Sequence, residues 1–395
     1  MDSSDEKSAK KSVLMLSSRM PYPPVGGDRL KNYNLIKILS KYYKIHLIVL
    51  TDTEPTEEEI NFCKTYCHAF KIFHKNKIQS IFNVFKYFFN QKPLQINYYY
   101  FNDVQSYVNY KIKDVDFIIN TLVRTSEYIL SSHKPKFLDM VDSISMNYER
   151  SAQKVTSFIW RLIYQYEVKL LRNYEKKCVQ SYKNTFFVNY SEADYWSKHG
   201  ETTWIPNGVN ETLFAYEKKN LKYQNYVAFF GKMDYSPNIE AVVWFIEKVF
   251  PHLHKDIKFI IVGGCPTDKI KSYKNDRIEV TDYVDDPYEI LNSTLCNVAP
   301  MQTGGGIQNK VLEAMALGSI NIVSYLGAEP IKGAEENVHL LIRNSPEEFI
   351  QIINKIYQDL PKYQFLKVNS KHLIKSKYTW GNYEKNLVKM LESSL

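Results

Sequence analysis

A chain of 395 residues, 44% of them hydrophobic, is long enough to form two globular domains with buried cores. No run of eighteen apolar residues and no signal-peptide pattern occurs, so we expect neither a transmembrane helix nor a secretory signal. The five cysteines form no Cys-x-x-Cys motif, which excludes the usual thiol metal and redox sites and favours reduced thiols in a cytoplasmic protein. The net charge of +8 suits an anionic membrane, substrate or nucleic acid and does not choose among them.

The first predicted domain opens with a βαβ unit whose loop is rich in proline and glycine. The expected strand, helix and strand lie at residues 13–16, 29–42 and 46–50. The loop puts Gly26 and Gly27 at the carboxyl end of the first strand, the edge where open α/β sheets bind ligands. Arg19 and Arg29 flank this loop. They either meet an anion there or are surface residues beside a structural turn.

Residues 75–100 combine aromatic and basic side chains in a way the rest of the chain does not. Lysines are interspersed with apolar residues at helical spacing, which are Ile78, Ile81, Phe82, Phe85 and Phe89. A basic amphipathic helix of this kind lies on an anionic membrane or packs its apolar stripe on a core, and the pattern leaves both open. The charges form no concentrated patch and no nucleic-acid motif accompanies them, so we expect no nucleic-acid partner.

Two later strands of the first domain end in polar residues. The strand at 117–120 leads to Arg124, and the strand at 137–141 contains Asp139 and is followed by Asp142. Because α/β enzymes keep their chemistry at the carboxyl ends of strands, we treat these side chains as catalytic candidates. If the reaction needs a general base, Asp139 or Asp142 would supply it.

The second predicted domain again alternates strands and helices, after a hinge at 204–209. Its strands and helices are expected at 226–231, 238–250, 259–263, 278–280, 285–292 and 346–358. We divide the chain into a loose tail, two doubly wound α/β domains and a final helix that packs back on the first domain. The boundaries are 1–12, 13–205, 206–377 and 378–395.

A glycine-rich loop and the helix after it, at residues 304–318, form the strongest candidate site. A predicted strand precedes the loop, and another follows the helix, so the stretch is one βαβ unit. Glycines permit positive φ and close approach to a ligand, and the free N–H groups at a helix start bind anions. Lys310 and Glu313 share the helix face toward the loop. The opposite face, which would pack on the sheet, carries Val311, Leu312 and Met315. The alternative is an ordinary βαβ unit with a solvated Lys–Glu pair.

Taken in order, these motifs resemble the GT-B glycosyltransferases of group 1 (family 4), with the closer likeness to bacterial sugar transferases of exopolysaccharide and surface-glycan clusters. The shared segments are residues 21–28, 231–238 and 306–315. The resemblance implies two Rossmann-like domains facing across a cleft. It also implies a hexosyltransferase that moves a sugar from a UDP-, GDP- or similar nucleotide sugar to a glycan or lipid-linked acceptor. The products would be capsule, O-antigen (lipopolysaccharide) or exopolysaccharide, made in the cytoplasm or at the cytoplasmic face of the inner membrane.

The resemblance also implies roles for particular residues. Glu313 would hold the ribose hydroxyls, while Lys310 and Lys232 would present cations to the donor phosphates. The backbone that faces the diphosphate and sugar would come from Gly304, Gly305, Gly306 and Ile307. Tyr283 and Val284 would flank the base, and Gly26 and Gly27 would face the reaction centre. The family's usual outcome is retention of the anomeric configuration, with no cofactor beyond the donor.

One departure from the family pattern concerns the donor sugar. Many relatives carry a glutamate eight positions before the one matched by Glu313, and this chain has Gly305 there. Two alternatives therefore stay open, a non-catalytic nucleotide-sugar-binding scaffold and a sugar-nucleotide epimerase. No Asp-x-Asp metal motif is found, and Asp285-Asp286 is interpreted as a solvated helix start. A helix N-terminus and one or two lysines would offset the charge of the departing diphosphate without Mg²⁺.

Overall fold

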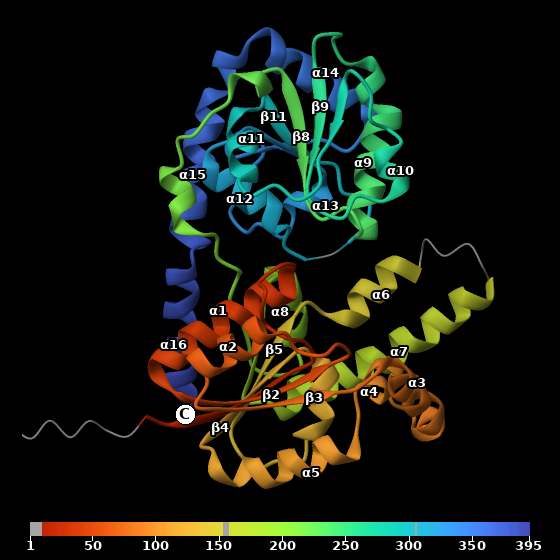
Figure 1. Cartoon of the computed structure of the whole chain (residues 1–395), viewed down its shortest axis with the longest axis vertical. Helices are drawn as coiled ribbons and strands as arrows, with labels where there is room; N and C mark the ends of the chain where they lie inside the picture. Colours follow the sequence, from red (N-terminus) through yellow and green to blue (C-terminus); the bar gives the residue numbers. More distant parts are fainter. Residues whose placement is uncertain (1–9, 153–157, 305) are drawn as a thin grey trace, which may run out of the picture. The chain divides into compact units, whose positions relative to one another are not determined.

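The computed structural model describes residues 10–152, 158–304 and 306–395. The chain forms two compact units (Figure 1). Unit 1 runs to Ile205 and takes in Asn386–Leu395, and unit 2 is Pro206–Lys385. The last helix, α16 (Trp380–Ser394), therefore begins in unit 2 and ends in unit 1.

Unit 1 is built on a seven-stranded parallel sheet in the order β3-β2-β1-β4-β5-β6-β7. Its strands are β1 (Ser12–Ser17), β2 (Lys44–Thr51), β3 (Ala69–His74), β4 (Phe117–Thr121), β5 (Lys136–Val141), β6 (Asn184–Phe187) and β7 (Thr202–Trp204). Its helices are α1 (Gly27–Tyr42), α2 (Glu57–Tyr66), α3 (Lys77–Lys86), α4 (Leu94–Tyr98), α5 (Asn102–Lys111), α6 (Ile144–Ala152), α7 (Phe158–Ser181) and α8 (Tyr190–Ser197). Strand order reverses between β1 and β4, which makes the carboxyl edge there the expected ligand edge.

Unit 2 is built on a six-stranded parallel sheet in the order β10-β9-β8-β11-β12-β13. Its strands are β8 (Tyr226–Phe230), β9 (Lys258–Val262), β10 (Ile278–Val280), β11 (Cys296–Ala299), β12 (Asn321–Val323) and β13 (Leu341–Ile342). Its helices are α9 (Ser236–Lys248), α10 (Asp268–Lys271), α11 (Pro287–Ser293), α12 (Asn309–Leu317), α13 (Tyr325–Ala328), α14 (Pro346–Gln358) and α15 (Gln364–Lys377). Here the order reverses between β8 and β11.

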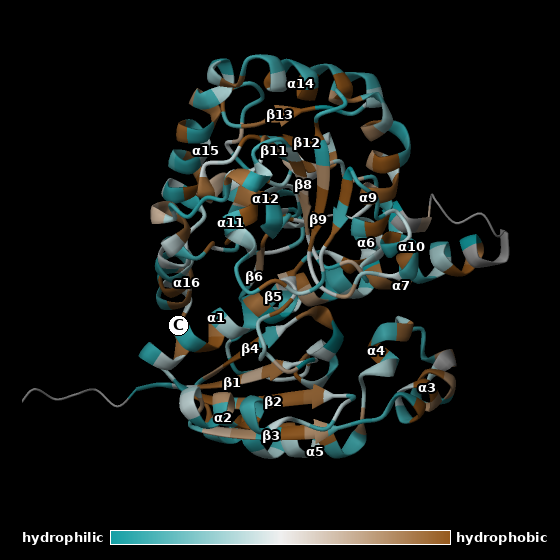
Figure 2. Cartoon of the chain, turned by 45° about the horizontal axis from the view of Figure 1, so that its top comes forward, coloured by the Kyte–Doolittle hydropathy of each residue, from teal (hydrophilic) through white to brown (hydrophobic). Residues whose placement is uncertain are grey.

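The central strands of both sheets are buried along nearly their whole length. Every residue of β4 and β5 is buried, as are four of the five residues of β9. Helices on both faces of a parallel sheet leave little strand surface in water, so the strands are apolar runs and not alternating ones. These strands are the brown centres of the two units in Figure 2.

Several elements of unit 1 were not predicted from the sequence, among them α2, β3 and α5. Helix α2 begins with a signal that the sequence carries, a capping box in which Thr56 Oγ1 accepts from the Glu59 N–H and Glu59 accepts from the Thr56 N–H. Strand β3 is harder to recognise because it lies at the sheet edge and its residues are only half-buried or exposed. The sequence also predicts a long helical region from about residue 155 to 181; the structure has α7 there, and residues 153–157 lie outside the described residues.

Candidate active site

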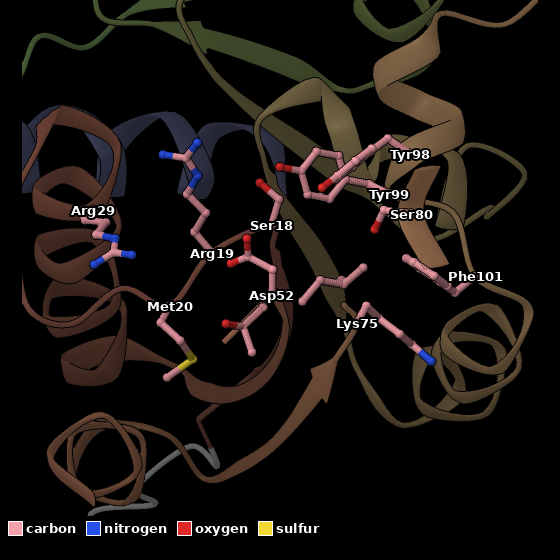
Figure 3. Close-up of a pocket in the computed structure, with 12 residues that line it drawn as sticks. Ser18, Arg19, Met20, Arg29, Asp52, Lys75, Ser80, Tyr98, Tyr99 and Phe101 are labelled. Carbon is pink, nitrogen blue, oxygen red and sulfur yellow. The ribbon is translucent and has the colours of Figure 1, made fainter. Parts of the chain in front are cut away.

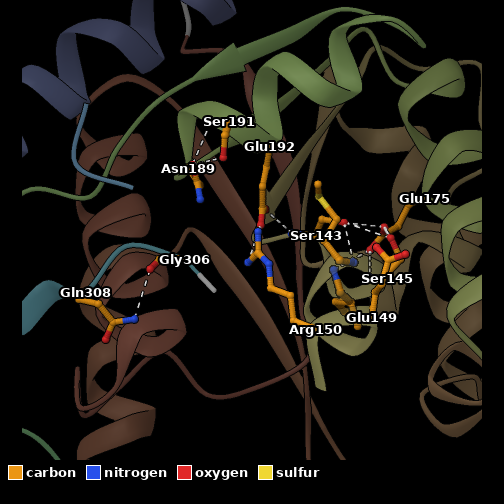
Figure 4. Close-up of polar contacts among 12 residues, drawn as sticks. Ser143, Ser145, Glu149, Arg150, Glu175, Asn189, Ser191, Glu192, Gly306 and Gln308 are labelled. Atoms are coloured by element: carbon orange, nitrogen blue, oxygen red, sulfur yellow. Dashed lines mark hydrogen bonds and ion pairs between the residues drawn. The ribbon is translucent and has the colours of Figure 1, made fainter. Parts of the chain in front are cut away.

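The glycine-rich loop lies at the carboxyl end of β11, beside the point where strand order reverses in unit 2. Gly304 and Gly306 have φ of 90° and 105°, in the left-handed region that favours glycine. Gln308 is the N-cap of α12, yet its side chain does not cap the helix and instead donates from Nε2 to the Gly306 carbonyl at 3.3 Å (Figure 4). The N-cap side chain thus leaves the first turn of α12 uncapped, and this turn keeps the character of an anion site. Ile307 is half-buried, and Gly305 lies outside the described residues.

Helix α12 presents the two faces that its sequence predicts. Val311, Leu312 and Met315 are buried at 2% exposure or less. Lys310 and Glu313 are only partly exposed, and each has its own partner. The Lys310 ammonium donates to Asn238 Oδ1 at 2.5 Å and lies 4.9 Å from the centroid of the Phe229 ring. Glu313 Oε2 accepts from the Tyr288 hydroxyl at 3.3 Å. The alternative of a solvated Lys–Glu pair is therefore wrong.

Burial brings the pKa values of Lys310 and Glu313 toward neutrality. It lowers the pKa of the Lys310 ammonium to about 7. Burial also raises the pKa of the Glu313 carboxyl to about 7, with the Tyr288 hydrogen bond acting in the opposite direction. Within the part of the chain that the structure describes, no carboxylate forms an ion pair with Lys310. A lysine and a glutamate desolvated on one helix face, each without a counter-ion, are typical of a ligand site.

Asn238 connects the Lys310 ammonium to the loop after β8. It is 4% exposed at the start of α9, and its Nδ2 donates to the Lys232 carbonyl at 2.8 Å. A Cβ on Gly231 would lie 2.7 Å from Asn238 Nδ2, so only glycine fits beside this amide. The sequence analysis did not name Asn238 as a site residue, although it ends the shared segment 231–238.

Lys232 reaches the site through its backbone, while its side chain is half-exposed. The ammonium forms an ion pair with Asp234 at 2.8 Å. A diphosphate would have to replace Asp234 as the partner of this cation. Lys310 is therefore the stronger candidate for binding the diphosphate, because among the described residues it has no carboxylate partner that the diphosphate would have to displace.

The loop after β10 carries Tyr283 and Val284. Tyr283 is 78% exposed, so its ring is available to a flat ligand. Asp282 Oδ1 accepts from the N–H of Tyr283 at 2.8 Å and of Cys265 at 3.1 Å, which ties this loop to the one after β9.

Asp285 and Asp286 lie at the start of α11 as expected, with Asp285 exposed and Asp286 partly exposed. Asp286 accepts from the Tyr216 hydroxyl at 2.7 Å and from the Lys218 ammonium at 3.1 Å, at the N-cap of α11. Among the described residues, no group of three or more His, Cys, Asp or Glu side chains is placed to hold a metal ion.

In unit 1, the Gly26–Gly27 turn lies between β1 and α1, where the sequence predicts it. Gly26 has φ 98° and is the N-cap, and Gly27 is the first helical residue. Arg19, which flanks the turn, forms an ion pair with Asp28 at 3.1 Å. Its charge is therefore partly balanced within the loop.

Asp139 is not a catalytic base, because its carboxylate belongs to an internal ion pair. Asp139 and Lys31 are both fully buried and bonded to each other, and the Lys31 ammonium lies 5.2 Å from the Phe186 ring centroid. Asp139 also accepts from the N–H of Val141, whose φ of 61° is in the left-handed region. Burial raises the pKa of Asp139 and Lys31 opposes that rise. The carboxylate is thus fully buried and bonded internally, and it holds the end of β5 through the Val141 N–H.

Asp142 is the remaining candidate base of unit 1. It is partly exposed, and burial raises its pKa to about 6 against the pull of Lys31 and Arg150. Its Oδ1 is buried without a hydrogen-bond partner.

The N-terminus of α6, directly after Asp142, is held by two buried glutamates (Figure 4). Glu175 accepts from the Ile144 N–H at 2.7 Å and from the Ser143 hydroxyl at 2.8 Å. Glu192 accepts from the Ser143 N–H at 2.6 Å, and its other oxygen lies 4.0 Å from Arg150. The chain thus fills this helix N-terminus with its own carboxylates, so it is a structural anchor and no anion site.

A cavity of about 180 Å³ lies at the carboxyl ends of β1 and β2, beside β3 and helices α1, α3 and α4 (Figure 3). Its cationic and aromatic lining comes from Arg19, Arg29, Lys75, Tyr98, Tyr99 and Phe101. Arg124 lies against it, since its guanidinium is 5.6 Å from the Tyr99 ring centroid and donates to Gln95 Oε1 at 3.0 Å. Arg19, Arg29 and the aromatic segment 75–100 were all singled out from the sequence. That they lie together depends on β3, which the sequence did not predict.

Comparisons with known proteins bear on both units. Residues 224–359 match the family described as glycosyl transferases group 1. A Klebsiella pneumoniae protein, described as an uncharacterized 44.6 kDa protein in the cps region, is 23% identical over 387 residues, covering 93% of this chain and 96% of that protein. An uncharacterized glycosyltransferase of Methanocaldococcus jannaschii is 27% identical over 187 residues, 44% of this chain and 47% of that protein.

Solved structures resemble the chain over nearly its whole length. The structure of Anabaena HepE in complex with UDP has a TM-score of 0.69 at 14% identity and covers 97% of this chain and 100% of that chain. Sucrose-phosphate synthase from Thermosynechococcus elongatus has a TM-score of 0.69 at 14% identity, covering 97% and 99%. The predicted two-domain α/β fold is confirmed.

Proposed function

We propose that this chain, which has the GT-B fold and whose residues 224–359 match the group 1 glycosyl transferase family, transfers a sugar from a nucleoside-diphosphate sugar to a saccharide acceptor. The observation that carries the proposal is the pair Lys310 and Glu313 on one helix, both desolvated to a pKa of about 7 beside a glycine loop. A diphosphate and a ribose diol are the ligand groups that satisfy this pair and the uncapped start of α12 together.

The chemistry asks for charge stabilisation at the departing diphosphate. Cleavage of the sugar–phosphate bond builds negative charge on the leaving oxygen, next to the first turn of α12 and the Lys310 ammonium in this arrangement. Preorganised positive groups at such a point are the largest expected catalytic contribution. The approach of the diphosphate raises the pKa of Lys310 and keeps it charged. Asn238 and the Phe229 ring hold the ammonium in place before the donor arrives.

Glu313 is proposed to accept from the ribose hydroxyls, and Tyr288 orients its carboxylate. Structures of Anabaena HepE contain UDP, UDP with glucose, or UDP-glucose. That likeness supports a uridine nucleotide as the donor carrier. We propose further that transfer needs no metal ion and retains the anomeric configuration. An inverting reaction would use Asp142 as its base.

The acceptor is proposed to bind in the cationic and aromatic cavity of unit 1 (Figure 3). Tyr98, Tyr99 and Phe101 offer flat faces to a sugar ring, and Arg29 offers a charge to an anionic group. The relative from a cps region of Klebsiella pneumoniae supports a role in surface polysaccharide synthesis, with a glycan or lipid-linked acceptor at the cytoplasmic face of the membrane.

The test is a panel of nucleotide sugars, incubated with the protein with and without a lipid-linked saccharide. Donor hydrolysis, or transfer with the anomeric configuration followed by NMR, is the expected result. Binding without turnover would indicate a non-catalytic scaffold. Gly305 in place of a carboxylate would then explain the missing activity. A changed sugar on an intact nucleotide would identify an epimerase.

A further inference from the structure

Helix α3 presents a stripe of large apolar side chains to solvent. Ile78, Ile81, Phe82 and Phe85 on the helix and Phe89 just after it are 50–92% exposed. The four helical positions follow the i, i+3, i+4, i+7 pattern of a single face. Folded proteins rarely expose a contiguous apolar surface of this kind unless something binds to it. The interpretation of this stripe as core-facing is therefore wrong.

The helix is ordered without help from its apolar stripe. Asn76 and Gln79 form a capping box at its start, with bonds of 2.9 and 3.3 Å. Asn83 Nδ2 donates to the Tyr100 carbonyl at 2.7 Å, and Ser80 is buried against the rest of unit 1. Polar bonds thus fix the inner face, and the large apolar side chains of the stripe remain exposed.

The charged residues of the segment that carries the stripe are all lysines. Between Lys75 and Asn102 the chain contains four lysines and no aspartate or glutamate. Lys75 and Lys92 pair with acids outside this segment, and Lys77 makes a long contact of 3.7 Å with Asp52. Lys86 lies over the Tyr87 ring at 5.0 Å, which leaves its ammonium at the edge of the stripe.

We propose that the apolar stripe of α3, with Phe89, docks unit 1 on an anionic lipid surface. Phenylalanine and isoleucine on one face with lysines at its edge match a helix lying in the headgroup region of a bilayer. A second copy of this chain fits less well, because a two-fold contact between identical stripes would bring lysine against lysine. No helix among the described residues is long and apolar enough to cross a membrane, so the contact is with the bilayer surface.

Docking through α3 would also bring the cavity of unit 1 close to the lipid surface. Ser80, on the inner face of α3, lines that cavity (Figure 3), and the exposed apolar stripe lies on the outer face of the same helix. The inference extends the proposed function, because an acceptor with an anionic headgroup and an apolar tail would meet the cavity at the lipid surface. Vesicle binding itself requires neither donor nor transfer, so the two proposals fail separately.

The experiment is flotation of the full chain with vesicles of phosphatidylcholine containing phosphatidylglycerol, and with phosphatidylcholine alone. We expect flotation with the anionic vesicles only, weakened by salt. Phe82→Ser/Phe85→Ser should reduce vesicle affinity by about tenfold or more, since two exposed phenylalanines lose their apolar contact. Lys77→Gln/Lys86→Gln should reduce it by about fivefold per lysine and flatten the salt dependence.

The matched control is Phe365→Ser/Val368→Ser on α15 of unit 2. This pair has the same spacing of three and is 47% and 70% exposed, and we expect it to float like the wild type. Circular dichroism and the thermal unfolding midpoint of the full chain verify that each variant stays folded. Wild-type protein that stays at the bottom, or an α3 variant that floats unchanged, overturns the proposal. So does a wild-type dimer in sedimentation that the α3 variant dissociates, because the stripe would then be a contact between copies.

Discussion

Replacing Lys310 with alanine separates a catalytic cation from a structural one. The substitution removes the bond to Asn238 Oδ1 and the contact with the Phe229 ring, and it leaves a buried amide oxygen without its donor. An unsatisfied buried acceptor costs about 1–3 kcal/mol. Against that loss, the wild-type protein holds an ammonium whose pKa burial has lowered to about 7, so at neutral pH the charged form is no longer strongly favoured. The two effects oppose each other, and we expect the variant to fold.

The effect on turnover should be much larger than the effect on stability. The diphosphate gains charge as the sugar bond breaks, so an ammonium beside it stabilises the transition state more than the bound donor. Loss of such a group reduces kcat on the order of a hundredfold or more. Lys310→Arg should recover only part, because a planar guanidinium does not occupy the place of an ammonium bonded to Asn238. Lys310→Met retains the length of the side chain without its charge and should behave as Lys310→Ala does.

The assay measures kcat and KM for donor hydrolysis or transfer beside UDP affinity from calorimetry. The expected pattern is a low kcat, a smaller change in UDP affinity and an unfolding midpoint close to that of the wild type. Lys232→Ala is the matched control, because that lysine comes from the neighbouring loop but already pairs with Asp234. Wild-type kcat in Lys310→Ala would refute the assignment, and a reversed order of the two variants would transfer the role to Lys232.

Three further outcomes test the same arrangement. Glu313→Gln should weaken UDP binding in calorimetry by about 1–3 kcal/mol, the loss of a charged hydrogen-bond partner, and unchanged affinity would remove Glu313 from the ribose. UDP affinity should be greatest near pH 7. Above pH 7 the Lys310 ammonium, whose pKa is about 7 and is raised by the diphosphate, loses its proton in the free protein. Below pH 7 the Glu313 carboxylate, whose pKa is also about 7, gains a proton and accepts fewer hydrogen bonds. Lys310→Met should flatten the alkaline side of that profile, and a wild-type profile without either decline contradicts the pKa values. Asp139→Asn should lower the free energy of unfolding in denaturant by about 3–5 kcal/mol, because it removes the carboxylate that pairs with the buried Lys31 charge, whereas a purely catalytic Asp139 would change turnover and leave the unfolding midpoint in place.

The sequence by itself determined the local features of the site. The spacing of apolar residues in 309–317 predicts which face of α12 is buried, because side chains that recur at the helical period share a face in any fold. The glycines predict a loop with positive φ, since no other residue takes that conformation easily, and Gly304 and Gly306 have it. Alternating strands and helices predict two doubly wound units, because each βαβ unit is built from segments that are neighbours in the sequence.

Only the tertiary structure decided what each of those faces meets. Lys310 and Asn238 are 72 residues apart, and Asp139 and Lys31 are 108 apart. Asp139 therefore looks catalytic at a strand end, until the packing of α1 buries Lys31 against it. The stripe of α3 is equally regular whether it lies on a core or in solvent, because periodicity defines a face and not its neighbour. Which neighbour a face has depends on contacts between distant segments, which form when the whole sheet assembles.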